Sequence, residues 1–289
     1  MERESMRTVN SISGGKTSAY ISANYKADYN LFALVRTLDK NCLFPDSKIR
    51  QIVSDKIGKE FIGTLEEDAI IYTMLDLEQF IGSEITWVAG KSFDEIINRN
   101  GKKYLPNRTQ RFCTTEMKLK PMFDWWKKTI NEPVEMRIGF RANEVSRVER
   151  MMLKTNENGF STFKNIIGKT KTGNSNKWEN TPWQKPLFPL IKDRIFKDKI
   201  ENFWSDKNVR FAYMNNCIGC FHRNEILLKK MSERHPEKFD WFCKQEENMG
   251  YNIRTFKNGI TYDKIRKHKL QIELFDDDFN ECDSGYCGL

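Results

Sequence analysis

The chain has 289 residues, of which 39% are hydrophobic, 12% aromatic and 30% charged. This content is enough for a large apolar core, so it excludes a disordered tail, a collagen-like chain, a coiled coil and a mini-protein. Lysine and arginine outnumber the acidic residues by 48 to 40, and the net charge of +8 favours an anionic partner, a nucleotide or a nucleic acid. A basic surface without a specific partner is the alternative.

Cysteine usage and hydropathy indicate the expected compartment. The seven cysteines are an odd number, and no basic segment followed by an apolar stretch marks an export signal, so we expect a cytoplasmic protein. No run approaches the ~20 apolar residues that span a bilayer, and no membrane partner is expected. In a reducing compartment, a closely spaced cysteine pair favours metal binding or redox chemistry over a structural disulfide.

Strands and helices alternate in the first half of the chain. Residues 7–13 alternate like a short strand, and Gly14-Gly15 and the start of a helix follow at once. The further segments expected are strands at 31–35, 84–88 and 134–138 and helices at 66–80 and 118–129. This order predicts a doubly wound, mostly parallel α/β sheet.

The second half is different in composition. Residues 154–181 are rich in Lys, Asn, Gly, Ser and Thr, which predicts a long, exposed and partly disordered insertion. A Pro-rich turn, an amphipathic helix near 193–204 and a helical region over 224–247 follow, and the acidic end is expected to be a mobile tail. We therefore divide the chain as follows: a nucleotide-binding α/β domain 1–150, a polar basic insertion 151–182, a smaller helical lobe 183–275 and a Cys-containing tail 276–289.

The segment Ser13–Ser18, Ser-Gly-Gly-Lys-Thr-Ser, is the first candidate site. A glycine pair between a strand and a helix lets backbone N–H groups surround an anion, and the helix N-terminus, Lys16 and the hydroxyls add donors and positive potential. This combination suits phosphate. A Walker A loop is excluded because its first glycine would fall on Asn10, and an ordinary capped strand-to-helix turn is the alternative.

Ligands of a doubly wound sheet bind beyond the carboxyl ends of its strands, so the segments after Ser13, Val88 and Ile138 are expected to converge. Gly139, Arg141 and Arg147 follow the last of these strands. Two guanidinium groups can clamp a phosphate or sulfonate, whereas a surface salt bridge is the alternative role of Arg147.

Cysteines form the third candidate site. Cys217 and Cys220 make a C-x-x-C turn, which suits zinc or iron–sulfur ligation but is only half of a site. Cys113 lies in a basic segment with Lys118, which can contact phosphate or sulfate; the alternative is a solvated basic face with a buried thiol. We expect Cys42 to have a packing role only.

These motifs together resemble the phosphoadenosine phosphosulfate (PAPS) reductase-like family of the PP-loop, or adenine nucleotide α-hydrolase, superfamily. The first segment resembles the PP-loop signature Ser-Gly-Gly-x-Asp-Ser, with Thr17 in place of Asp. The second resembles Cys-Cys-x-x-Arg-Lys-Val-x-Pro-Leu, with Thr114 in place of the second Cys. Further matches, in family order, are Gly139-x-Arg141 with Arg147, Trp183-x-x-Pro186-Leu187, Cys217-x-x-Cys220 and the terminal Cys287-Gly288-Leu289, where Tyr286 replaces Glu and the final His is missing.

The resemblance implies an α/β domain that binds ATP or a related adenine nucleotide with Mg²⁺, and a [4Fe–4S] cluster. The implied nucleotide-binding residues are Ser11, Ser13, Gly14, Gly15, Lys16, Thr17, Ser18, Lys118, Gly139, Arg141 and Arg147. The implied cluster ligands are Cys113, Cys217 and Cys220, with Cys282 as the fourth. Zinc, a site without metal, an open iron, or a fourth ligand from Cys243 or Cys287 are the alternatives.

The resemblance also implies three functions. The first is an ATP pyrophosphatase that cleaves at the α-phosphate, with Lys16 and Arg141 in catalysis, and transfers sulfur from a donor to a tRNA or DNA acceptor. The second is a PAPS or adenosine phosphosulfate reductase in which Cys287 is the nucleophile and a thioredoxin-like protein the reductant. The third is a catalytically silent protein that binds nucleotide or nucleic acid. The oligomeric state stays open, with a homodimer as one option.

Overall fold

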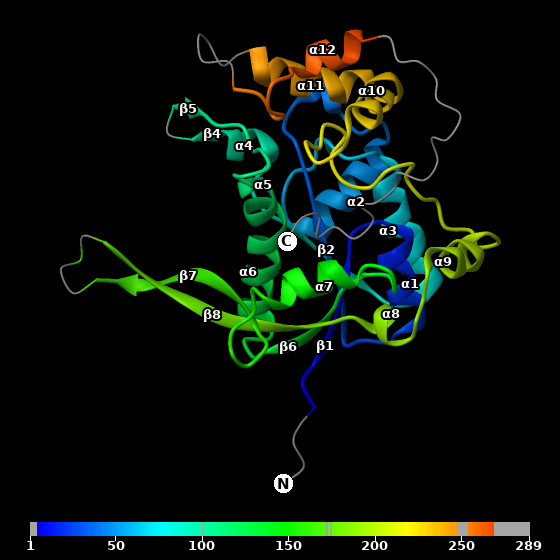
Figure 1. Ribbon diagram of the computed structural model, residues 1–289, viewed down its shortest axis with the longest axis vertical. Helices are drawn as coiled ribbons and strands as arrows, with labels where there is room; N and C mark the ends of the chain where they lie inside the picture. The colour runs from blue at the N-terminus through cyan, green and yellow to red at the C-terminus, as the bar shows by residue number, and fades with distance from the viewer. Residues whose placement is uncertain (1–4, 100, 171–172, 174, 248–253, 269–289) are drawn as a thin grey trace.

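The computed structural model describes residues 5–99, 101–170, 173, 175–247 and 254–268 and is built on a six-stranded sheet (Figure 1). Its strands are β1 (Thr8–Ile12), β2 (Tyr29–Leu34), β3 (Ile85–Ala89), β6 (Val134–Arg137), β7 (Ser161–Lys169) and β8 (Asn176–Leu187). The spatial order is β3-β2-β1-β6-β8-β7, and all neighbours are parallel except β7 and β8. The predicted α/β class is confirmed.

The chain changes direction across the sheet at β1. This strand pairs with β2 on one side, where Val9 lies opposite Tyr29, and with β6 on the other, where Val9 lies opposite Met136. The connections that leave β1 and β6 at their carboxyl ends therefore run to opposite sides, and a crevice between them is the common ligand position in such sheets.

Helices cover both faces of the sheet because β2 presents apolar side chains to both. Leu31 and Ala33 belong to a core with α6 (Lys120–Thr129), whereas Phe32 and Leu34 belong to a core with α1 (Lys16–Asn24) and α3 (Ala69–Ile81). A continuous apolar run is typical of a strand buried on both sides. The other helices of the α/β part are α2 (Ser47–Ile57), α4 (Phe93–Ile97), α5 (Phe112–Thr114), the π-helical η2 (Thr115–Leu119), α7 (Val145–Met152), α8 (Pro189–Lys192) and α9 (Lys197–Trp204); η1 (Lys40–Cys42) is a 3-10 turn, and β4 (Asn98–Arg99) pairs with β5 (Lys102–Lys103).

Local sequence fixes several helix ends. The carboxylate of Asp46 accepts hydrogen bonds from the first amides of α2, and Gly58 ends this helix at φ +62°. Ser92 and Glu95 form a reciprocal capping box at the start of α4. Side-chain caps satisfy amides that have no partner inside the helix, and a left-handed residue satisfies carbonyls at the other end.

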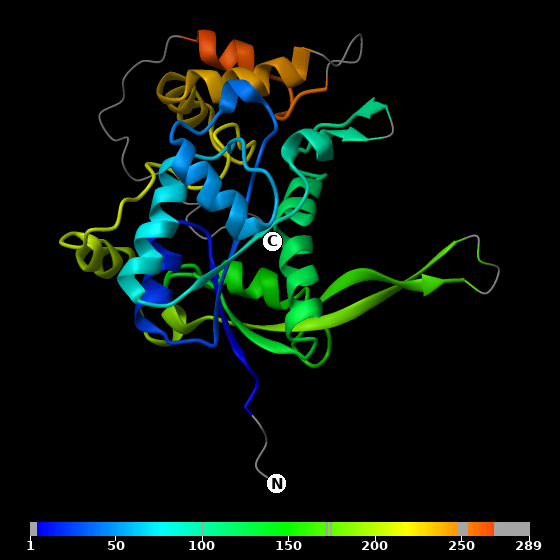
Figure 2. The same cartoon turned by 180° about the vertical axis from the view of Figure 1, so that it is seen from behind.

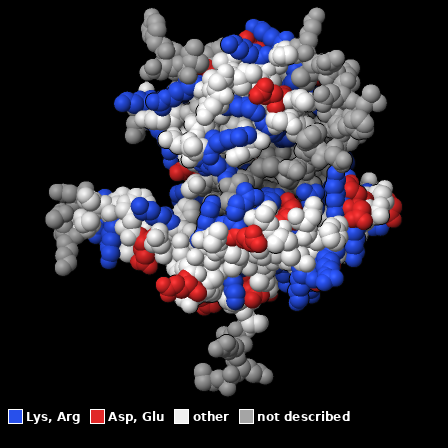
Figure 3. Space-filling view, in the orientation of Figure 1, with Lys and Arg blue, Asp and Glu red and all other residues white. Residues whose placement is uncertain are grey.

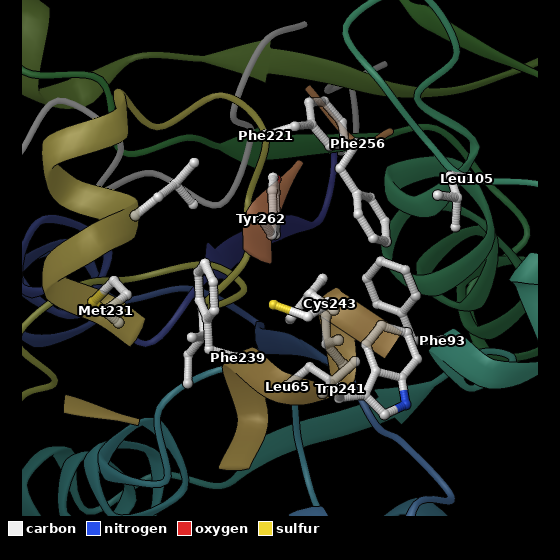
Figure 4. Close-up of a cluster of buried hydrophobic side chains, with 14 of the residues drawn as sticks. Leu65, Phe93, Leu105, Phe221, Met231, Phe239, Trp241, Cys243, Phe256 and Tyr262 are labelled. Atoms are coloured by element: carbon white, nitrogen blue, oxygen red, sulfur yellow. The ribbon is translucent and has the colours of Figure 1, made fainter. Parts of the chain in front are cut away.

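The C-terminal lobe consists of α10 (Glu225–Arg234), α11 (Pro236–Glu247) and α12 (Tyr262–Lys267). Its helices enclose an aromatic core that includes Phe239, Trp241 and Tyr262 (Figure 4). Phe242 of α11 belongs to the same core. The same core includes residues of the α/β part: Val35, Leu65, Phe93 and Met117. The lobe and the α/β part therefore share one apolar core rather than packing as separate units.

The insertion expected over residues 154–181 contains β7 and the first part of β8. These two long antiparallel strands extend away from the body (Figure 2). Cross-strand pairs such as Ile166 with Trp178 give this polar segment a strand pattern, and Gly168 lies at an irregularity of the ladder. The expected exposure is observed for its outer part.

No helix among the described residues is both long and apolar enough to cross a membrane. The expected acidic tail 276–289, including Cys282 and Cys287, lies outside the described residues.

Candidate functional site

The glycine loop forms the strand, turn and helix that the sequence predicts. Gly14 has φ +82°, and a Cβ at this position would lie 2.6 Å from Cγ2 of Ile70, so the turn requires glycine. Ser18 Oγ accepts a hydrogen bond from the Ser13 amide at 3.1 Å and donates one to Gly15 O at 3.1 Å. These bonds fix the loop against the first turn of α1, where free helix amides can bind an anion.

Lys16 points toward α9 in this structure. Its Nζ forms an ion pair with Glu201, while its carbonyl accepts a hydrogen bond of 3.0 Å from Nε1 of Trp204. About a third of each charged side chain of this pair is exposed, 35% for Lys16 and 39% for Glu201, so an incoming phosphate can compete for the lysine.

The segment after β6 lies against the loop, as predicted. A Cβ on Gly139 would lie 3.4 Å from the Ser18 amide nitrogen and from Cγ2 of Thr17. Arg141, which follows, is 7% exposed. The segments after β1 and β6 therefore converge at the carboxyl edge of the sheet, where a ligand is expected.

A single carboxylate holds both candidate arginines. Glu144 Oε2 accepts hydrogen bonds from the amide of Arg141 at 2.8 Å and from its Nε at 3.2 Å, and Oε1 accepts one from Arg147 at 2.5 Å. Burial opposes ionisation of Glu144, but these donors outweigh it and lower its pKa. The salt bridge considered as the alternative for Arg147 is thus present, and the group of two arginines and one glutamate retains one positive charge.

The three described candidate cysteines line one pocket. Cys113 comes from α5, and Cys217 and Cys220 come from the turn before α10. The other lining residues are Phe93, Arg111, Thr114, Met117, Lys118, Asn216, Gly219, Phe221, His222, Phe242 and Phe256. The structure therefore brings together residues separated by more than 100 positions in the sequence.

The C-x-x-C turn is fixed from both sides. A Cβ on Gly219 would lie 2.4 Å from the ring of Phe242, so only glycine allows this approach. The carbonyl of Gly219 accepts a hydrogen bond of 3.0 Å from the Tyr262 hydroxyl. Arg223 donates to three carbonyls before and within the turn, those of Asn215, Asn216 and Cys217.

Titratable groups around the pocket shift one another's pKa. Burial and the neighbouring Cys220 raise the pKa of Cys113 to about 11, and burial and Glu66 raise the pKa of Cys217. Lys118 forms a buried ion pair with Glu66 at 3.1 Å. Burial lowers the pKa of Lys118, but Glu66 and the cysteines outweigh it and raise the pKa.

His222 is neutral in this surrounding. Burial and the nearby charges of Arg111 and Arg108 lower its pKa to about 4. Its Nε2 and the Nε of Arg111 are buried atoms without a hydrogen-bond partner among the described residues. Both therefore can bond to a group that enters the pocket.

The structure brings together Cys113, Cys217 and Cys220, but does not describe the expected fourth metal ligand. Within the described residues, no group of three or more His, Cys, Asp or Glu has the arrangement of a metal site, and Cys282 lies outside them. Figure 4 shows the sulfur of Cys243 among apolar side chains, and burial raises its pKa to about 12. Cys42 is also buried in the core, which agrees with its expected packing role.

A second, smaller pocket lies beside the glycine loop and shares lining residues with the cysteine pocket. Ser11 and Ser13 are among its lining residues. Thr114 and Lys118 line both this pocket and the cysteine pocket. The two candidate sites are therefore neighbours, separated by the side chains of η2 and its preceding turn.

Sequence reasoning missed two residues that organise the site. Glu66 holds Lys118, and Arg223 holds the carbonyls of the C-x-x-C turn. An acidic run, Glu66-Glu67-Asp68, and a basic residue three positions after Cys220 were the available signals. Neither signal indicates its partner, because the partners are distant in the sequence.

In comparisons with known proteins, no family model matches this chain, and no curated protein matches it in sequence.

Proposed function

We propose that this protein binds ATP or a related adenine nucleotide at the glycine loop and cleaves it at the α-phosphate, as in the PAPS reductase-like enzymes that its motifs resemble. The observation that carries the proposal is the shared wall of two pockets. Thr114 and Lys118 line both the pocket beside Ser11 and Ser13 and the pocket of the three cysteines. A nucleotide phosphate and a reactive sulfur would then lie side by side.

The loop supplies the phosphate contacts. The amides of Gly15 and the first turn of α1 bind phosphate oxygens, and Lys16 exchanges Glu201 for the phosphates. Arg141 follows Gly139, which lies against this turn, and would stabilise the charge that develops at the α-phosphorus. Mg²⁺ bound with the nucleotide would offset the charge of the leaving pyrophosphate. Thr17 stands where the family signature has Asp, so the phosphates would bind the metal without a carboxylate at this position.

The cysteine pocket fits a thiolate-bound cofactor in donor type and in charge. Cys113, Cys217 and Cys220 would hold a [4Fe–4S] cluster, with zinc as the alternative and Cys282 as the candidate fourth ligand. Lys118 and Arg111 line this pocket and offset the negative charge of such a group. When bound, the cluster would supply a reactive sulfur next to the nucleotide.

The reaction that follows has two displacements. An oxygen of the acceptor, a tRNA or DNA, attacks the α-phosphorus, and pyrophosphate leaves. A sulfide-level sulfur from the donor then attacks the acceptor atom that bears the activated oxygen. A bond from that atom to sulfur forms, its bond to oxygen breaks, and AMP leaves with that oxygen. The proton of the sulfur nucleophile passes to water.

The experiment uses the full chain purified without oxygen. We expect ATP binding by calorimetry, pyrophosphate release that depends on Mg²⁺, and about four iron and four sulfide per chain. Cys217→Ala should lose the iron, whereas Cys42→Ala, a buried cysteine outside the pocket, should keep it. Absence of ATP binding would overturn the proposal, and sulfite release from PAPS without pyrophosphate release from ATP would support the reductase alternative instead.

A further inference from the structure

The hairpin of β7 and β8 is a basic arm. Residues 161–187 contain five lysines and one glutamate. Residues 166–169 and 177–180, which form the outer part of both strands, are exposed. In Figure 3, basic side chains lie on this protruding part of the molecule, beside an acidic group. A concentration of positive charge on an extended ribbon favours a polyanionic partner and disfavours a second copy of the same arm.

Exposed apolar side chains lie between these lysines. Ile166, Ile167 and Trp178 are 43%, 42% and 52% exposed. Ile166 lies opposite Trp178 in the ladder, and Nζ of Lys164 lies 5.5 Å from the centre of the indole ring. An indole flanked by ammonium groups can stack on a base while the lysines neutralise phosphates, which is how proteins bind single strands.

A pocket lies at the root of the arm. Phe163 and Trp183 form apolar walls, and Lys154 and Gln184 add polar groups. Gln184 is 2% exposed, and its Oε1 has no hydrogen-bond partner among the described residues. A buried amide oxygen of this kind is costly unless a ligand donates to it. Aromatic walls and one acceptor suit a planar base with an exocyclic amino group.

The root pocket adjoins the nucleotide pocket. Leu119 lines both the root pocket and the pocket beside Ser11 and Ser13. A base held at the root of the arm would therefore lie one side chain away from the proposed reaction site.

We propose that the arm and its root pocket bind a nucleic-acid strand, with an unpaired base in the pocket. The lysines and Trp178 hold the strand along the hairpin, and Gln184 accepts a hydrogen bond from the amino group of adenine or cytosine. The assignment of this strand as the acceptor rests on the proposed function, whereas its binding does not.

The first test measures fluorescence anisotropy of labelled single-stranded RNA, single-stranded DNA and duplex DNA with the full chain and without ATP. We expect a single strand to bind more tightly than duplex, and the comparison of RNA with DNA identifies the sugar. Trp178→Ala should weaken binding about tenfold. A triple variant, Lys164→Ala, Lys169→Ala and Lys177→Ala, should lower the salt slope of log K by roughly two.

The matched control removes the same charge elsewhere. Lys48, Lys192 and Lys199 are exposed lysines outside the arm, and their replacement by alanine should leave the affinity within about twofold. Equal losses in the two triple variants, or no binding of any strand, would overturn the proposal.

The pocket is tested by base identity. Wild type should bind oligoadenylate or oligocytidylate more tightly than oligouridylate, and Gln184→Leu should remove this preference. A wild type without preference would overturn the pocket assignment. Calorimetry with ATP separates the two proposals, because the arm variants should bind ATP normally, whereas failure of ATP binding in wild type would leave strand binding intact.

Discussion

Gly14 is the residue at which the glycine loop has least freedom. Its φ of +82° disfavours any side chain, and a Cβ would also meet Ile70. We expect Gly14→Ala to lower the free energy of unfolding by about 1–3 kcal/mol and to weaken ATP binding, because the amides of the loop must move.

Gly58 is a matched control for this substitution. It has a similar φ of +62°, but nothing lies within 4 Å of a Cβ built there. Gly58→Ala should therefore lower stability through backbone conformation alone, by about 1 kcal/mol, and leave ATP binding unchanged. Urea unfolding and calorimetry measure both effects, and equal ATP affinities in the two variants would contradict the role of Gly14.

The ionisation of Glu144 makes the stability of the folded protein depend on pH. Its pKa is lowered because the donors of Arg141 and Arg147 outweigh the effect of burial. Ionised Glu144 therefore stabilises the folded protein above its unfolded-state pKa of ~4.3. This stabilisation is lost as the pH falls through the lower folded-state pKa. Glu144→Gln removes the charge.

We expect Glu144→Gln to be less stable than wild type by about 2 kcal/mol near neutral pH, with a smaller difference at acid pH. Urea unfolding between pH 3 and pH 7, followed by circular dichroism, provides the comparison. A difference that stays constant over this range would mean that the carboxylate does not hold the two arginines as described.

At the scale of elements, the C-x-x-C turn depends on an arginine rather than on regular structure. Arg223 is 9% exposed and donates to the carbonyls of Asn215, Asn216 and Cys217. A lysine cannot reach several carbonyls at once with fixed geometry. Arg223→Lys should lower stability by about 1.5–3 kcal/mol and reduce the iron bound per chain.

The exposed Arg210 is the control for this exchange. It pairs with Asp76 at 2.7 Å, and 59% of its side chain is exposed. Arg210→Lys should change stability by less than about 1 kcal/mol and should not affect the iron content. If the two arginine variants behaved alike, Arg223 would have no special role in the turn.

The positions of helices and strands could be predicted from the sequence better than the pairing between them. The strand expected at 31–35 forms because an apolar run is the pattern of a doubly covered strand, and β2 spans Tyr29–Leu34. The arm was not predicted, because lysines and asparagines dominate its composition, and its strand pattern becomes visible only in pairs such as Ile166 with Trp178.

At the scale of the whole molecule, strand polarity predicted that the segments after Ser13, Val88 and Ile138 converge, and the structure brings those after β1 and β6 together. The sequence did not predict the contact between Glu66 and Lys118 or the shared core of the lobe, since long-range side-chain packing leaves no local pattern. The grouping of Cys113 with Cys217 and Cys220 came from the resemblance, and the common pocket is a property of the fold.

The shared core predicts that the α/β part and the C-terminal lobe unfold together. Lys238 of α11 is 7% exposed and donates to Glu66 O at 2.8 Å and to Asp68 Oδ1 at 2.7 Å, both just before α3. Lys238→Met leaves these acceptors without the ammonium group and should lower stability by about 1–3 kcal/mol. Because both parts share one core, amide exchange should accelerate by similar factors in β2 and in α11.

Lys244→Met, at a 54% exposed position of the same helix, should change neither the stability nor the exchange rates. Acceleration confined to the three C-terminal helices would instead show that the lobe unfolds as a unit of its own.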